Sequence, residues 1–352
     1  MTSKVERIRA AQEDERAEEI SSSRRQNASA AWARASAEVG AVMWAGLALL
    51  ARIGIARIGA IELLFLFAAL VIVPLGVELG RTIGGSALLD EIARWAQPVG
   101  AATALVSLLL PPGLLAGLMA CGWLVLCLVL AVSGMIHFIF SSWLEADGSV
   151  RSTLAQLTLG VARIDLAVGG IWLVASRLGM RPMGIQEPIG LLTAVHFHFA
   201  GFATAMIAAA TLQFAEKRGK ARGLRLLVPL VIGMPFVVAA GFVISPVLKM
   251  VAALVFSASV AGLAVFLHSV AKRVEDLSAR IFLRAAAISV FAGMVLSGTY
   301  AVADLVGSDV LTIPQMARTH GILNAVGFCL LGTLGWLVSF SAQKSARRGK
   351  SN

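Results

Sequence analysis

The sequence predicts an all-α fold, a polytopic transmembrane helix bundle of about nine spans, within limits of eight and ten. Of its 352 residues, 58% are hydrophobic and 14% are charged, whereas soluble domains have roughly 45–50% and about 25%. The apolar residues also gather in runs of about 20, the length of a helix that crosses a bilayer. Because backbone polar groups in lipid must be bonded internally, such long continuous runs favour helices over a barrel.

Nine apolar runs qualify as spans. Pro111, Pro112 and Gly113 predict a tight turn after the second span, and Pro246 predicts another after the sixth. In chain order, the runs are Ile61–Gly80, Ile92–Leu110, Leu114–Phe140, Leu154–Ala175, Ile189–Phe214, Leu224–Ser245, Val247–His268, Ile281–Leu305 and Thr319–Phe340.

The chain divides into four parts. Residues 1–40 form a polar N-terminal extension with seven basic and seven acidic residues. Residues 41–58 suit either an interfacial amphipathic helix or a marginal span, because Arg52 and Arg57 follow a short apolar run. Residues 59–341 make the transmembrane domain, and residues 342–352 are a basic tail.

The distribution of the net charge of +10 along the chain indicates the membrane topology. It resides in three segments, 216–225, 272–284 and the tail, with net charges of +4, +2 and +4. By the positive-inside rule we expect all three in the cytoplasm, in a multi-pass protein of the bacterial plasma (inner) membrane. Nine spans would place the N-terminus outside, and ten would place both ends inside. The expected partner is the lipid bilayer and not nucleic acid, because no basic patch interleaves with aromatic residues. The oligomeric state stays open.

Several polar side chains are expected at the same depth, in the outer half of the membrane. They come from the fifth, eighth and ninth spans, and polar groups inside a membrane indicate function by default. They define a hypothetical pocket for a substrate or a proton, consisting of His196, His198, Tyr300, Asp304, His320 and Asn324.

The chemistry of this pocket has several interpretations. An Asp–His combination could relay protons. We expect no cofactor, but imidazoles with a carboxylate could hold a transition metal, and two imidazoles could hold haem iron, through His196, His198 and His320. His196 and His198 point about 200° apart on a regular helix, so one ring could bond a neighbouring helix instead. The alternative is a purely structural role, in which all these groups make hydrogen bonds between helices.

Two acidic residues are secondary site candidates. Asp165 lies inside the fourth span, two residues after Arg163, so the two side chains face different ways. Glu62 lies at the start of the first span. Glu78 lies near the other end of that span, where we expect it to reach the interface.

The chain resembles a known family. The segments that carry the resemblance are Ile61-Glu62-Leu63-Leu64-Phe65, Val71-Ile72-Val73-Pro74-Leu75, the run His-Phe-His-Phe-Ala-Gly-Phe at 196–202, His320-Gly321 and Asn324-Ala325-Val326-Gly327-Phe328. They look like the YndJ-like family of bacterial integral membrane proteins, over about residues 57–340. The resemblance implies a multi-span protein of the transporter type with no settled substrate, and it supplies no catalytic residue.

We therefore expect a transporter or permease with a polar outer pocket, acting on an unknown small solute or a proton. A membrane redox protein holding metal or haem is the alternative, and a non-catalytic sensor or scaffold is a further one. No nucleotide-binding loop and no hydrolase or kinase motif is present, so an enzyme is not expected.

Overall fold

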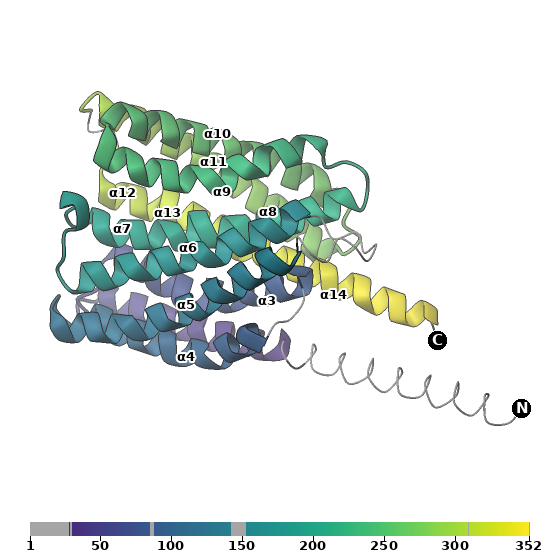
Figure 1. The fold of residues 1–352 in the computed structure, drawn as a ribbon, viewed down its shortest axis with the longest axis horizontal. Helices are drawn as coiled ribbons and strands as arrows, with labels where there is room; N and C mark the ends of the chain where they lie inside the picture. The colour runs from purple at the N-terminus through teal and green to yellow at the C-terminus, as the bar shows by residue number, and fades with distance from the viewer. Residues whose placement is uncertain (1–27, 29, 85–87, 142–152, 309, 352) are drawn as a thin grey trace, which may run out of the picture.

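A computed structural model describes residues 28, 30–84, 88–141, 153–308 and 310–351. Over these residues the chain is helical and contains no strand. Nine helices are long and apolar enough to cross a membrane, and Figure 1 shows long helices packed side by side. The predicted all-α bundle is confirmed.

Three of the long rods are continuous helices that contain a π-helical segment. The first rod comprises α2 (Ala60–Phe67), η1 (Ala68–Ile72) and α3 (Val73–Gly84). The second comprises α7 (Ile189–His196), η4 (Phe197–Ala203) and α8 (Thr204–Glu216). The third comprises α12 (Ile313–Arg318), α13 (His320–Ile322), η5 (Leu323–Leu330) and α14 (Leu331–Ser351).

The remaining long helices are single elements. They are a helix at Ala30–Arg52, α4 (Leu88–Leu109), α5 (Leu114–Ser141), α6 (Thr153–Arg177), α9 (Arg222–Ile244), α10 (Pro246–Ala271) and α11 (Leu277–Leu305). A short 3-10 turn, η3 (Pro182–Gly184), lies between α6 and α7. The two predicted turns are present, since α4 and α5 are joined at Leu110–Gly113 and α10 begins at Pro246.

The set of nine spanning candidates differs from the predicted nine in two members. Ala30–Arg52 qualifies by length and hydropathy, although the sequence suggested a division at residue 40. Helix α4 is absent from the nine, since its first half carries polar residues, among them Asp90, Glu91, Arg94 and Gln97. With its 22 residues it is still long enough to cross the bilayer and packs along α5. Ten antiparallel helices place Ala30 at the same end as the end of α14.

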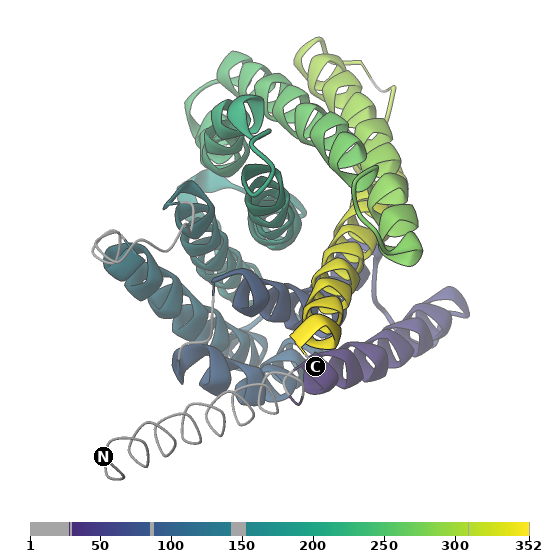
Figure 2. The same ribbon diagram turned by 90° about the vertical axis from the view of Figure 1, so that its right-hand side faces the viewer.

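Most of the predicted N-terminal extension, residues 1–27 and 29, lies outside the described residues. Residues 41–52 of the segment expected at 41–58 belong to the single helix Ala30–Arg52, whose most apolar stretch is only 17% buried. By contrast, 78% is buried in each of the rods Ala60–Gly84 and Ile189–Glu216. These two rods are therefore the core of the bundle. Viewed from the end in Figure 2, the green helices α9–α11 and the blue helices α4–α6 lie on different sides of the molecule.

The three π-helical segments contact one another. Residues of η1, η4 and η5 lie against each other in all three pairings. A π-helical turn adds one residue to the hydrogen-bonded ring and recurs at functional sites in helices. The hydropathy pattern of the sequence gave no indication of these segments. Their contact places irregular backbone from all three rods at one position in the core.

The two ends of the bundle differ in charge. We call the end formed by the α8–α9 and α10–α11 connections the basic end, because it carries the segments 216–225 and 272–284. Helix α6 begins at this end with Thr153. It finishes at the opposite end with Arg177, beside the turn between α4 and α5.

Candidate functional site

His198 is enclosed in the core. Its Nδ1–H donates to the carbonyl of Ala194 over 2.7 Å, and its Nε2 accepts from the indole Nε1 of Trp123 over 2.9 Å. The rings of Phe65 and Trp123 pack on it, and all three side chains have no exposed surface. Both ring nitrogens are therefore bonded, and His198 connects η4 to α5. We call these three residues the aromatic box.

His196 and His320 come from two different rods, at the end of α7 and the start of α13. The Nδ1 of His196 bonds the carbonyl of Leu192 over 2.7 Å. The Nδ1 of His320 bonds the Gly293 carbonyl of α11 over 2.8 Å. Each ring is thus anchored to a helix backbone through Nδ1, and the two histidines are close enough to interact electrostatically.

Asn324 supports His320 from one helical turn away. Its amide Nδ2 donates to the backbone carbonyl of His320 over 2.8 Å. Gly293 makes room for this amide, because a Cβ at position 293 would lie 2.9 Å from Nδ2. His320 and Asn324 therefore form one group that joins the third rod to α11.

Tyr300 and Asp304 belong to a different group. The carboxylate of Asp304 forms an ion pair of 2.6 Å with Lys249 of α10. Both side chains of this pair are partly exposed, and Tyr300 lies near enough to interact with Asp304. Three of the six residues predicted to line one outer pocket thus bond different partners: Trp123 for His198, Gly293 for His320 and Lys249 for Asp304.

Glu62 lies near the opposite end of the bundle, close enough to Arg177 for their charges to interact. Arg177 is buried and donates to the carbonyls of Ser107 and Leu110, over 3.2 and 2.6 Å. These carbonyls belong to the last turn of α4 and to the connection after it, which have no helical partner of their own. Arg177 therefore fastens α6 to α4, and Glu62 offsets its charge.

Asp165 has the most unusual environment among the described residues. It is the central residue of α6, its side chain has no exposed surface, and neither carboxyl oxygen has a hydrogen-bond partner. Gly201 of η4 lies against it, since a Cβ at position 201 would be 2.8 Å from both Cγ and Oδ2. An unpaired ionised carboxylate at such a site costs several kcal/mol, so the charge must be neutralised by something that binds there.

Arg163, two residues nearer the basic end, is paired. Its Nη2 forms an ion pair with Oδ2 of Asp90 over 3.0 Å, and the hydroxyl of Ser133 donates to the other oxygen of Asp90 over 2.7 Å. All three side chains are buried. This contact joins α4, α5 and α6, and it compensates the charge of Asp90.

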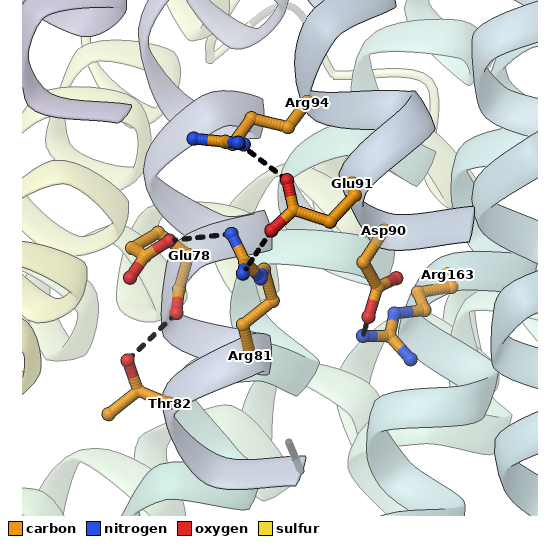
Figure 3. A network of polar contacts seen from close by, with 7 residues as sticks. All are labelled: Glu78, Arg81, Thr82, Asp90, Glu91, Arg94 and Arg163. Atoms are coloured by element: carbon orange, nitrogen blue, oxygen red, sulfur yellow. Dashed lines mark hydrogen bonds and ion pairs between the residues drawn. The ribbon is translucent and has the colours of Figure 1, made fainter. Parts of the chain in front are cut away.

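A second group of charges continues toward the surface of the basic end (Figure 3). Arg81 of α3 bonds Glu78 over 3.5 Å and Glu91 over 2.8 Å, and Glu91 also pairs with Arg94 over 2.5 Å. The Glu91 side chain is 34% exposed. Glu78, expected at the interface, is instead buried, because Arg81 supplies its partner inside the bundle. We call these four residues, with Asp90, Ser133 and Arg163, the charge ladder.

Sequence reasoning missed most of the charge ladder. Arg81, Asp90 and Glu91 lie at the ends of apolar runs, where charges usually reach water. The available signal was their number, since four charged residues between positions 81 and 94 exceed what a short connection needs. Helix α4 carries three of them into the bundle.

Among the described residues, no three His, Cys, Asp or Glu side chains come together in a way that could hold a metal ion. His198 has no free ring nitrogen to offer. Two hollows lie elsewhere: a small one between Trp32 and Arg94 near the N-terminal helix, and a shallow one of about 370 Å³ around Pro98 and Thr103 on α4.

The fold and these buried charges define the class of the protein, a polytopic membrane helix bundle with ionisable groups inside it. The chain belongs to the YndJ-like family, because the family model, described as YndJ-like protein, matches residues 63–328. The resemblance noted in the sequence is confirmed. The matched region runs from α2 to η5 and contains Asp165, the aromatic box and the charge ladder.

One curated relative is a protein of Bacillus subtilis (strain 168) described as "Uncharacterized membrane protein YndJ". It is 30% identical over 176 residues, which cover 50% of this chain and 31% of the relative. This chain therefore matches about a third of the length of that relative. No solved structure matches the chain.

Proposed function

We propose that this protein is a carrier in the bacterial plasma membrane that moves a small solute by coupling it to a cation bound at Asp165. The basic end would face the cytoplasm, as the positive-inside rule requires. The observation that carries the proposal is the buried carboxyl group of Asp165, whose two oxygens have no hydrogen-bond partner. No enzymatic step is part of the proposal.

The comparison with Arg163 supports a functional role for Asp165. Asp90 compensates Arg163, so that pair can serve to hold helices together. No such partner compensates Asp165, and an apolar residue or asparagine would fill the same position without a charge. Uncompensated ionisable residues within membrane spans typically belong to ion or proton pathways. The proposed cation would supply the missing compensation.

The surroundings of Asp165 also suit a carrier. Gly201 is part of the π-helical segment η4, which contacts η1 and η5. Carriers commonly bind their ions near the membrane midplane, where helices depart from regular geometry. Asp165 lies at the middle of α6, and the three irregular segments meet at the neighbouring position. A change in the charge at Asp165 would therefore act on η4, and through η4 on the junction of the three rods.

Transport by purified protein in liposomes tests the proposal. A panel of solutes is offered under a proton gradient, a sodium gradient or neither, and uptake is compared between the native chain and Asp165→Asn. We expect gradient-driven uptake of at least one solute, and its loss in Asp165→Asn. Asp304→Asn is the matched control, because its carboxylate is partly exposed and already paired with Lys249. Uptake that survives Asp165→Asn, or that falls equally in both variants, would contradict the proposal.

A further inference from the structure

The identity of the cation at Asp165 follows from what surrounds the carboxyl group, and this inference rests on the proposed function. We infer that the cation is a proton and that it reaches Asp165 from the basic end of the bundle, along the charge ladder. The opposite direction is closed by the aromatic box. Three observations support the inference: the few ligands beside the carboxyl, the polar groups on one side of it, and the apolar seal on the other.

The site offers a metal cation few ligands. Hard cations in proteins take about six oxygen ligands, and a single carboxylate supplies at most two. Gly201, which lies against the carboxyl group, has no side chain to contribute. Nearby in η4, the carbonyl of Phe199 already accepts the hydroxyl of Thr204 over 2.9 Å. A proton needs no further ligand, because protonation alone removes the charge.

No other charged group takes the place of the proton. Besides Asp165, helix α6 carries Arg163, paired with Asp90, and Arg177, bonded to Ser107 and Leu110. The other charged and titratable groups lie on the elements packed against α6, among the side chains that the structure describes. None of them is a hydrogen-bond partner of either Asp165 oxygen. They are Glu78 and Arg81 on α3, Cys121 and Cys127 on α5, His196 and His198 on the η4 rod, Glu216 at the end of α8, and Arg222 and Arg225 at the start of α9.

Polar groups lead from Asp165 to the basic end. Arg163 lies two residues away in this direction, and Asp90 and Ser133 bond to one another beside it. Arg81 is close enough to Arg163 to interact electrostatically, and it bonds Glu91. Glu91 is one-third exposed, so its carboxylate can exchange protons with the solution. The charge ladder thus extends from the surface to Arg163, whose position on α6 is two residues before Asp165.

The opposite direction begins with an apolar seal. Gly169 lies one turn beyond Asp165 on α6, and a Cβ there would be 2.6 Å from Nδ1 of His198. His198, Trp123 and Phe65 are fully buried, and both nitrogens of His198 are already bonded. Because no ring nitrogen is free, this box cannot pass a proton onward without breaking a hydrogen bond.

Labelling with an apolar carbodiimide tests the inference without a known solute. Dicyclohexylcarbodiimide adds to a protonated carboxylic acid, and the adduct on the peptide that contains Asp165 is quantified by mass spectrometry. We expect labelling that falls about tenfold for each pH unit above the protonation midpoint and that is unchanged by sodium. Protection of Asp165 from labelling by sodium at constant pH would contradict the assignment of the cation as a proton.

The side of access is tested in proteoliposomes with different pH values inside and outside. Trypsin cleavage at the exposed residues Lys217, Arg218 and Lys220 reports which compartment faces the basic end. The labelled fraction should follow the pH of that compartment, and dependence on the other compartment would overturn the access route. Trp123→Phe keeps a ring in this space but frees Nε2 of His198 to exchange a proton, so in this variant we expect labelling to respond to both compartments.

The two proposals can fail separately. If labelling shows the expected pH dependence but no solute is taken up, the proton site at Asp165 is supported and the proposed carrier function is contradicted. If uptake is lost in Asp165→Asn but sodium protects against labelling, the carrier function is supported and the assignment of the cation as a proton is contradicted.

Discussion

The carboxyl group of Asp165 occupies the space that a side chain at position 201 would need. A Cβ built on Gly201 would lie 2.7 Å from Cβ of Asp165 and 2.8 Å from its Cγ and Oδ2. Real Cβ atoms do not approach other atoms this closely. The glycine therefore lets the middle of α6 touch η4, and the contact leaves no room for a polar side chain of η4 that could compensate the carboxyl.

Gly201→Ala should consequently destabilise the protein. We expect a loss of about 1–3 kcal/mol, the range for overpacking a close contact, and reduced carbodiimide labelling as Asp165 is displaced. Gly233→Ala is the control, because a Cβ there meets nothing within 4 Å on α9. Thermal unfolding in detergent compares the two. An equal melting temperature for both variants would show that α6 and η4 separate without cost.

The ion pair between Arg163 and Asp90 should contribute strongly to stability. Removing one partner by Arg163→Met leaves a buried charge, and we expect a loss of about 3–5 kcal/mol. The double variant Arg163→Met/Asp90→Asn should recover part of it, since the amide retains an acceptor for Ser133. Unfolding in a mixed-detergent titration measures both.

The exposed pair between Arg225 and Glu216 is the control for this prediction. Its distance of 2.8 Å is similar, but the Arg225 side chain is 61% exposed. Arg225→Met should therefore cost less than about 1 kcal/mol. Equal effects of Arg163→Met and Arg225→Met would mean that burial does not strengthen the inner pair.

The sequence was sufficient to predict the spans, because hydropathy over about 20 residues depends only on the local chain. It failed at helix α4, where the predicted run begins at Ile92 and the helix begins at Leu88. In the sequence, Asp90 and Glu91 interrupt the apolar pattern just before Ile92. In the fold, Arg163 and Arg81 compensate them from other helices, and no local pattern contains that information.

The candidate site was predicted only in part. Helical period placed His196 and His198 about 200° apart, so that one ring could bond a neighbouring helix, and in the structure His198 accepts from Trp123 of α5. The partner of that bond, Trp123, is 75 residues away in the sequence. Depth in the membrane suggested that Asp304 joins the histidines, but depth does not fix position around the bundle. Asp165 was a secondary candidate because burial without a partner is visible only once the helices are packed.

The hydrogen bond from Trp123 to His198 should stabilise the aromatic box. In Trp123→Phe the ring still fills the space, but Nε2 of His198 loses its donor. A buried acceptor without a partner costs about 1–3 kcal/mol. A second substitution, His198→Leu, should cost less in Trp123→Phe than in the native chain, and mixed-detergent unfolding of the four proteins measures this coupling.

Trp172→Phe on α6 is the matched control, because the Trp172 side chain is only partly buried. We expect little change in its free energy of unfolding. Strictly additive effects of Trp123→Phe and His198→Leu would contradict an energetic role for the bond.

Arg177 should hold the end of α6 to the end of α4. Its guanidinium donates through Nε to Ser107 and through Nη2 to Leu110, and this fork satisfies two carbonyls at once. Arg177→Lys keeps the charge but offers only one nitrogen, so it should lose part of the stability, and Arg177→Met should lose more, about 1–3 kcal/mol for buried acceptors left unpaired. Arg181→Met, four residues later and exposed, is the control. If charge near Glu62 were the only contribution, Arg177→Lys would unfold like the native protein, whereas an intermediate free energy of unfolding would assign the remainder to the fork.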